Sequence, residues 1–184
     1  MKIEIYENPS QEIKNSAYAF GLTNFYDSTT DIKAESKEVE EKYFSVPHAI
    51  LLAYENDDIV GRIYLHKREI KLGKNTILLG GIGGVCTHKD KRHQGMATLM
   101  LEKSMDVLRK WKCDVAYLCT NIDKLGKLYT NVGFVPLNKK YTFRGKSGKL
   151  YEENSGMIAE VNSAELFDEI MDPKTKVYLG EGNW

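Results

Sequence analysis

The stretch of sequence that decides the fold is residues 76–134, which read TILLGGIGGVCTHKDKRHQGMATLMLEKSMDVLRKWKCDVAYLCTNIDKLGKLYTNVGF. It begins with apolar residues interrupted by glycines, which predicts a strand whose backbone can be approached closely. After a basic turn, apolar residues recur at the spacing of one helix face, so a helix is expected to open within residues 92–97 and to stop at 110–112. Residues 115–118 predict the next strand, and residues 128–134 close the unit with a second glycine turn. We expect the rest of the chain to be organised around this unit.

The turn at residues 92–97 has the properties of a phosphate-binding site. The first N–H groups of a helix have no partner within the helix, and the positive end of the helix dipole lies beside them. Gly95 leaves room for a phosphate to approach, and Arg92 adds a forked donor for its oxygens. Many helix starts read Arg-x-x-Gly-x-Ala, so the specificity comes from the ordered set that follows it. No P-loop is present, since no Gly-Lys-Ser/Thr follows a Gly-x4 spacing, and the strand glycines are not placed as in a dinucleotide-binding turn.

The bulk composition is that of an ordinary globular protein, and we expect residues 1–184 to form a single domain. The 26 basic and 26 acidic residues cancel, which predicts no nucleic-acid partner. No stretch reaches membrane-spanning length and the N-terminus is no signal peptide, so we expect no membrane partner and a cytoplasmic location. Three cysteines without a C-x-x-C pair predict neither a metal site nor a set of disulfides. The oligomeric state stays open, with a homodimer among the alternatives.

The flanking regions predict further elements. The expected strands are residues 2–7, the hairpin 49–54 and 59–65, and residues 141–144 and 157–161. Ser10 and Ser163 are expected to cap helices, the second of which runs to Ile170, and a charged helix is expected from Ile32 to Phe44.

These residues resemble the acetyl-CoA-binding core of the GNAT N-acetyltransferases. The family signature Arg/Gln-x-x-Gly-x-Gly/Ala is matched by Arg92-x-x-Gly95-x-Ala97, and a strand of the V-x-V/T type precedes it at residues 85–87. The resemblance implies an α/β (α+β) fold, in which a mixed, mostly antiparallel sheet is splayed at its central strand and carries helices on both faces. It also implies acetyl-CoA (coenzyme A) as cofactor. The cofactor-binding residues that it implies are Val85, Cys86, Thr87, Arg92, His93, Gln94, Gly95, Met96, Ala97, Thr98 and Asn121.

The resemblance implies two catalytic groups. The Val85 N–H would point at the thioester oxygen, where negative charge develops, and losing such a donor typically costs about 3–4 kcal/mol. Tyr129, in a match to the family pattern L-Y-x-x-x-G-F/W, would be the acid for the departing thiolate. A modestly lowered Tyr pKa would suit that role, since thiols titrate near about 8.5 and Tyr near about 10. Two of these residues have a purely structural alternative: Tyr129 could only pack on the sheet, and Asn121 could only shape a turn. Cys86 could act as a nucleophile, but a small apolar residue of the strand is the better interpretation of this cysteine.

Over nearly its whole length the chain is also similar to the aminoglycoside 2'-N-acetyltransferases. The match rests on Lys67-Arg68-x-Ile70-x-x-Gly73, on the Tyr129 motif and on a late helix followed by a tail ending in Trp. In that subfamily the C-terminal carboxylate, a tail acid and an acid of the first inter-helix loop reach the substrate. The corresponding substrate-binding residues here are Trp184, Glu181 (shifted by one), and Asp27 or Asp31, and we expect the Trp184 indole to pack into the body of the protein.

One position departs from that subfamily. Its members carry a Glu two residues before the position of Val85, and that Glu draws the amine proton through water. This chain has Gly83 there, so either another acid takes the proton or the acceptor differs.

The leading hypothesis is an N-acetyltransferase that moves an acetyl group from acetyl-CoA to a primary amine of a small cationic molecule. The alternatives are a non-catalytic acyl-CoA-binding sensor domain, and an acetyltransferase for a protein Lys or N-terminus.

Overall fold

A computed structural model describes residues 2–25 and 32–184, with residues 32–36 described by their backbone only. Within the described chain, seven strands form one sheet in the order β1-β2-β3-β4-β5-β9-β6. Their bounds are β1 Lys2–Glu7, β2 Ala49–Glu55, β3 Asp58–Leu72, β4 Asn75–Thr87, β5 Val115–Cys119, β6 Val135–Pro136 and β9 Gly156–Glu160. All neighbours pair antiparallel except β4 and β5, which run parallel, so the predicted mixed and mostly antiparallel sheet is confirmed.

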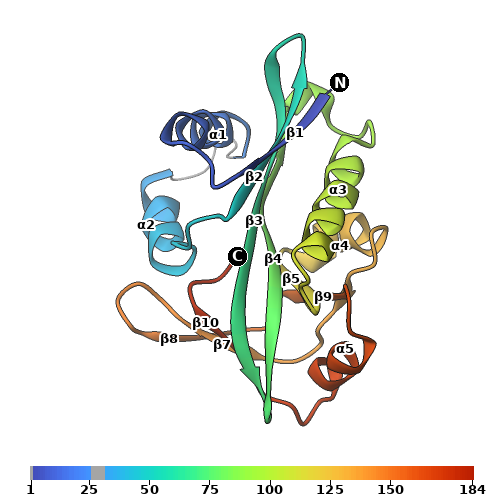
Figure 1. Ribbon diagram of the computed structural model, residues 1–184. Helices are drawn as coiled ribbons and strands as arrows, with labels where there is room; N and C mark the ends of the chain where they lie inside the picture. The colour runs from blue at the N-terminus through green and yellow to red at the C-terminus, as the bar shows by residue number, and fades with distance from the viewer. Residues whose placement is uncertain (1, 26–31) are drawn as a thin grey trace.

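A second, three-stranded sheet is formed by the last third of the chain in the order β10-β7-β8. Its strands are β7 Tyr141–Arg144, β8 Leu150–Glu153 and β10 Val177–Glu181. The sequence predicts β7, but β8 and β10 are too short and too mixed in composition to stand out. This sheet lies beside the lower half of the long β3–β4 hairpin (Figure 1).

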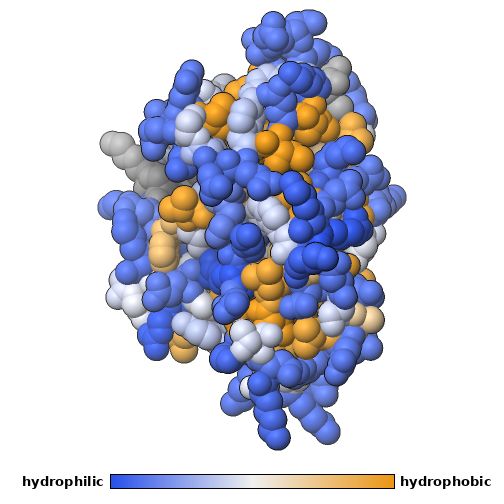
Figure 2. All heavy atoms as spheres, viewed as in Figure 1, coloured by the Kyte–Doolittle hydropathy of each residue, from blue (hydrophilic) through white to orange (hydrophobic). Residues whose placement is uncertain are grey.

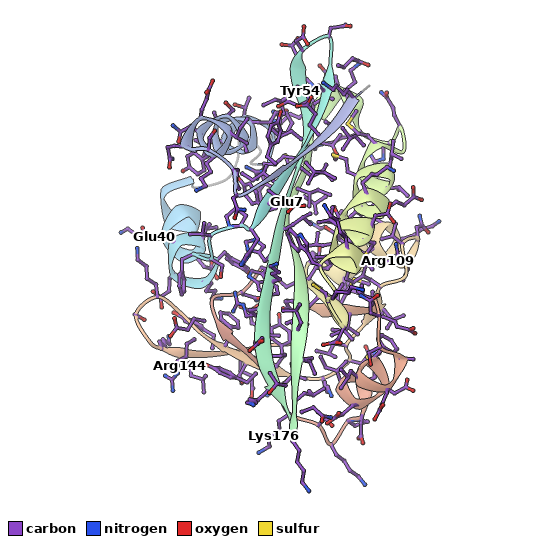
Figure 3. All side chains as sticks on the ribbon, in the orientation of Figure 1. Glu7, Glu40, Tyr54, Arg109, Arg144 and Lys176 are labelled. Carbon is purple, nitrogen blue, oxygen red and sulfur yellow. The ribbon has the colours of Figure 1, made fainter. Side chains whose placement is uncertain are left out.

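The helices cover both faces of the main sheet, as predicted. They are α1 Gln11–Asn24, α2 Ile32–Lys42, the short 3-10 turn η1 Lys89–Lys91, α3 Met96–Lys110, α4 Ile122–Thr130 and α5 Ala164–Met171. α1 and α2 lie on one side of the hairpin, and α3 and α4 lie on the other (Figure 1). β2 is buried on both faces, because Ile50 and Leu52 pack with Ala17 of α1 while Leu51 joins the core beneath α3. Figure 3 shows side chains filling the space between α3 and the central strands.

Local signals in the sequence explain where the elements begin and turn. The Ser10 hydroxyl accepts from the Ile13 N–H at 3.3 Å, and the Ser163 hydroxyl accepts from the Leu166 N–H at 3.2 Å, so both predicted N-caps are confirmed. Asn56 and Asp57 take positive φ angles of 48° and 66° in the tight turn between β2 and β3. No helix in the described part of the chain is both long enough and apolar enough to cross a membrane.

The feature that positions the site is the opening between β4 and β5. These strands pair only from Leu79 to Gly81, opposite Val115 to Tyr117. Beyond that point β4 stays paired with β3 as far as Thr87, whereas the end of β5 stays paired with β9. The two strands therefore separate after Gly81, and the predicted splay of the central strand is confirmed.

Candidate functional site

The last residues of the sequence lie in this opening. Trp184 is 6% exposed, and its indole covers Gly81 so closely that a Cβ on Gly81 would lie 1.9 Å from Cε3 of the ring. The Trp184 carbonyl oxygen accepts from the backbone N–H of Cys119 at 3.3 Å and lies 2.8 Å from its Sγ. Figure 1 marks the C-terminus beside the middle of β3. The predicted packing of the Trp184 indole into the body of the protein is confirmed.

Arg68 of β3 holds this tail in place. Its guanidinium donates to the carbonyl oxygens of Leu179 at 2.9 Å and Gly182 at 3.0 Å, and its Cζ lies 4.1 Å from the centre of the indole. Asn183, which is 1% exposed, accepts from the Tyr117 hydroxyl at 2.9 Å. The tail is therefore tied to β3 and to β5, the strands on either side of β4.

His66 completes the packing around the tail. Its ring stacks on the indole of Trp184 with centroids 5.3 Å apart and planes 11° apart. Burial, and then the nearby positive charge of Arg68, lower the pKa of His66 to about 3, so the imidazole is neutral at neutral pH. A Cβ on Gly83 would lie 3.6 Å from Nε2 of His66 and 3.5 Å from the carboxyl carbon of Trp184. The space beside Gly83 is thus lined by a weak base and the tail.

Val85 lies in a β-bulge of β4. Arg62 pairs with Cys86 and Tyr64 pairs with Gly83, so two residues of β4 face one residue of β3. Gly84 has a φ angle of 58°, and a Cβ there would lie 2.6 Å from the Tyr64 ring, so this position requires glycine. The bulge turns the backbone of β4 where it separates from β5.

The N-terminus of α3 has the features that bind an anion. Gly95 is the N-cap with a φ angle of 79°, and open space surrounds the position of its missing Cβ. The first helical hydrogen bond runs from the Leu99 N–H to the Gly95 oxygen, which leaves the N–H groups of Met96, Ala97 and Thr98 without a helical partner. Gly95 has no side chain with which to cap this end, and none of the residues in the first turn of α3 is acidic. The residues therefore fit a phosphate group, as the sequence predicts.

The basic side chains of this turn are partly engaged within the protein. Arg92 is exposed and donates to the carbonyl oxygens of Asn24 at 2.6 Å and Thr87 at 3.4 Å, which links the end of α1 to the end of β4. Gln94 donates to the Asp90 carbonyl oxygen at 3.2 Å, and His93 is exposed with a φ angle of 61°. A shallow depression beside Gly95 is lined by Glu55, Lys91, Gln94, Met96 and Leu99. A second depression lies between β1 and α3, away from this turn.

Tyr129 is buried in α4, 5% exposed, with its ring edge-on to Phe134 at 6.3 Å. Burial raises the pKa of Tyr129 to about 12, although a hydrogen bond with the Thr120 side chain opposes part of this rise. The pKa of Tyr129 is therefore raised, not modestly lowered as would suit the acid role, because burial outweighs the hydrogen bond. Asn121 caps α4, accepting from the Lys124 N–H at 3.1 Å, so its side-chain oxygen is already engaged.

Cys86 is 4% exposed, and burial raises the pKa of its thiol. Both facts argue against the nucleophile alternative, since the thiolate is the reactive form.

The residues expected on the acceptor side are only partly brought together. Trp184 and Gly83 meet in the opening, whereas Glu181 is exposed at the end of β10, and Asp27 and Asp31 lie outside the described residues.

Sequence reasoning missed Glu153 of β8. Its carboxylate accepts from the Asn183 side chain at 3.2 Å and from Lys42 of α2 at 2.9 Å, close behind the tail. The Tyr43 hydroxyl lies 3.7 Å from the Cys119 Sγ in the same region. No motif marks these residues, because the contacting pairs lie 30 to 111 positions apart in the sequence.

The family follows from comparison with known proteins. A family model described as "Acetyltransferase (GNAT) domain" matches residues 8–136, which is more than half of the chain. The chain belongs to the GNAT acetyltransferase family. Among curated protein sequences no match is found.

Solved structures of GNAT proteins share the fold at low sequence identity. The GNAT family N-acetyltransferase YhbS from Escherichia coli, solved in complex with CoA, is 12% identical with a TM-score of 0.61, and the match covers 97% of this chain and 88% of that one. The ribosomal-protein-S18-alanine N-acetyltransferase from E. coli is 13% identical with a TM-score of 0.54, over 89% and 96% of the chains. A GCN5-related N-acetyltransferase from Anabaena variabilis is 15% identical with a TM-score of 0.55 over 77% of this chain, which spans only 34% of that protein.

Proposed function

We propose that residues 1–184 form one catalytic domain that moves an acetyl group from acetyl-CoA to a primary amine of a small cationic acceptor. The observation that carries the proposal is the opening of β4 from β5 after Gly81, followed in the chain by α3, whose first N–H groups have no partner within the helix. Membership of the GNAT family supports acyl-CoA-dependent acetyl transfer in general.

The residues of the chain suit the cofactor along its length. The N–H groups of residues 96–98 would hold the pyrophosphate, with Arg92 and the open space at Gly95 beside them. The backbone of residues 85–87 has no β5 partner and would pair with the amide-rich pantetheine arm. When bound, acetyl-CoA supplies the acetyl thioester.

Two groups of the chain would act on the reacting atoms. The amine nitrogen bonds to the acetyl carbon, the carbon–sulfur bond breaks, the amine loses a proton and the sulfur gains one. The Val85 N–H would donate to the thioester oxygen as charge develops there. Tyr129 would protonate the sulfur, and its pKa of about 12 keeps it protonated at neutral pH.

The pKa of a neighbouring thiol supports a proton transfer from Tyr129 to sulfur. Burial raises the pKa of the Cys119 thiol to about 12, the same value as for Tyr129. A thiolate leaving in equally buried surroundings would therefore be basic enough to accept the Tyr129 proton.

The acceptor side favours a cation. Glu153, which Lys42 already pairs with, supplies a carboxylate behind the tail, and the aminoglycoside-acetyltransferase resemblance adds Glu181 and either Asp27 or Asp31 as acids. Gly83 has no side chain to take the amine proton, and His66, with a pKa of about 3, is too weak a base. We propose that a carboxylate on this side takes the proton through water.

Thiol release in the presence of a panel of amines tests the proposal. Small polyamines and aminoglycosides are expected to release coenzyme A faster than peptides with free N-termini or Lys side chains. Release with peptides alone would support a protein acetyltransferase. Tight coenzyme A binding without release for any amine would support the sensor alternative and contradict the enzyme.

A further inference from the structure

Arg62 of β3 is a buried cation that the chemistry described above does not use. It is 6% exposed, and its guanidinium donates to three oxygens: the Ala17 carbonyl at 2.7 Å, the Tyr64 hydroxyl at 2.9 Å and the Gly84 carbonyl at 3.2 Å. Among the described residues no carboxylate forms an ion pair with it. Its partners are therefore a helix backbone, a ring hydroxyl and the bulge of β4.

The surroundings are shaped to hold this guanidinium. A Cβ on Gly21 of α1 would lie 1.9 Å from Nη1 of Arg62, so only glycine leaves room for it. On another side, Cζ of Arg62 lies 4.5 Å from the centre of the Tyr64 ring, in a cation–π contact. The guanidinium is fixed from α1, from β3 and from β4.

The bond to Gly84 bears directly on Val85. The Gly84 carbonyl and the Val85 N–H belong to one planar trans peptide unit, so they point in opposite directions. Holding the carbonyl toward Arg62 therefore directs the N–H to the other side of the strand. A charged donor on the carbonyl also polarises the peptide, which makes its N–H a stronger donor.

We propose that Arg62 is a positioning residue for acetyl transfer, which orients and polarises the Gly84–Val85 peptide so that its N–H can stabilise the thioester oxygen. The inference rests on the function proposed above. It assigns a role to a residue that would not touch the substrate.

The experiment compares the wild type with Arg62→Met, which removes the charge at similar length, and with Arg109→Met as control. Arg109 is an exposed Arg on α3, 52% exposed in its side chain. Three quantities are measured: kcat and KM with the best amine, the coenzyme A Kd, and the infrared carbonyl stretch of bound acetyl-CoA labelled with carbon-13 at the thioester carbon. Amide chemical shifts of the ligand-free proteins report on the Val85 N–H itself.

Removing a whole oxyanion donor costs about a hundredfold to a thousandfold in kcat, so weakening one is expected to cost about tenfold to a hundredfold in Arg62→Met. The coenzyme A Kd of Arg62→Met should stay within about twofold of the wild-type value. The carbonyl stretching frequency of bound acetyl-CoA should move toward its value in free acetyl-CoA, and the Val85 amide proton resonance should shift upfield relative to the wild type. Arg62→Lys, which keeps the charge, should recover part of each effect, and Arg109→Met should match the wild type.

Gly21→Ala tests the inference if Arg62→Met does not fold, because it displaces the guanidinium from α1 and leaves β3 and β4 unchanged in sequence. A folded Arg62→Met or Gly21→Ala protein with wild-type kcat, carbonyl stretch and Val85 shift would overturn the role of Arg62. If the wild type itself fails to bind coenzyme A, or binds acetyl-CoA with no change in the carbonyl stretch, the proposed function fails instead.

Discussion

Two glycines of β4 provide a matched test of how the tail is packed. Gly81 and Gly83 are two positions apart, so their missing side chains would lie on the same face of the strand. A Cβ at Gly81 would lie 1.9 and 2.4 Å from ring atoms of Trp184, far inside van der Waals contact. A Cβ at Gly83 would lie 3.5 Å from its nearest neighbour, which is an ordinary contact. Gly81→Ala must therefore move the indole, whereas Gly83→Ala need not.

The size of the effect follows from what holds the indole. The stack on His66 and the guanidinium of Arg68 leave Trp184 little freedom to shift. Overpacking of this kind costs about 1–3 kcal/mol, rising to about 3–5 kcal/mol if the ring is expelled from its site. Replacing a strand glycine by alanine returns about 0.5–1 kcal/mol in either variant. Because this gain is common to both variants, we expect the free energy of unfolding of Gly81→Ala to lie about 1–3 kcal/mol below that of Gly83→Ala, and that of Gly83→Ala to equal or slightly exceed the wild-type value.

Urea unfolding followed by circular dichroism measures both variants against the wild type. The expected result is a lower midpoint for Gly81→Ala with an unchanged m-value, and a midpoint at or above that of the wild type for Gly83→Ala. Equal midpoints for the two variants would refute the reasoning, because they would show that the indole does not occupy the space above Gly81.

Three further predictions concern single side chains. Arg92→Ala should weaken coenzyme A binding by about 5- to 150-fold in calorimetry, which corresponds to the loss of a charge-assisted hydrogen bond of about 1–3 kcal/mol. It should also lower the urea midpoint, because the hydrogen bond to the Asn24 carbonyl is lost. An unchanged affinity would show that Arg92 does not bind the phosphate. Tyr129→Phe should lower kcat at least about tenfold while KM for acetyl-CoA stays within about twofold, since the hydroxyl is needed mainly in the transition state; a wild-type kcat would leave Tyr129 as a packing residue. The pKa of His66 is about 3 in the folded protein and about 6.5 in the unfolded chain, so between these pH values only the unfolded chain binds a proton at His66. The free energy of unfolding should therefore fall by about 1.4 kcal/mol for each unit by which the pH is lowered in this range. His66→Phe should lose that part of the slope in urea titrations at several pH values, and an identical slope would place the pKa of His66 near its ordinary value.

The central architecture could be predicted because its signals are local. The glycine-rich strand, the basic turn at Gly95 and the helix after it follow one another directly in the sequence, and each has a distinct periodicity or capping residue. The N-caps at Ser10 and Ser163 are likewise read from a few adjacent residues. These signals are sufficient to predict the opening in the sheet and the helix end at which we propose that phosphate binds.

The rest of the site depends on contacts between distant segments. Arg62 meets Gly84 and Ala17 only because α1 folds back over β3 and β4, and an isolated Arg within a strand gives no hint of burial. Arg68 appeared in a sequence motif, yet its role in holding the tail depends on residues more than a hundred positions away. The raised pKa of Tyr129 cannot be predicted from sequence for the same reason, since burial is a property of the packed structure. Figure 2 shows a mostly hydrophilic face with apolar patches, and a surface view does not reveal Arg62, which is only 6% exposed.

The central claim is that coenzyme A lies across the opening of β4 and reaches the N-terminus of α3. Titration of nitrogen-15-labelled protein with coenzyme A, followed by amide chemical shifts, tests it most directly. We expect the largest shifts on the N–H groups of residues 85–87 and 95–98, with saturation below millimolar coenzyme A. The absence of saturable shifts up to millimolar coenzyme A, or shifts concentrated on the far side of the sheet around α1 and β1, would contradict it.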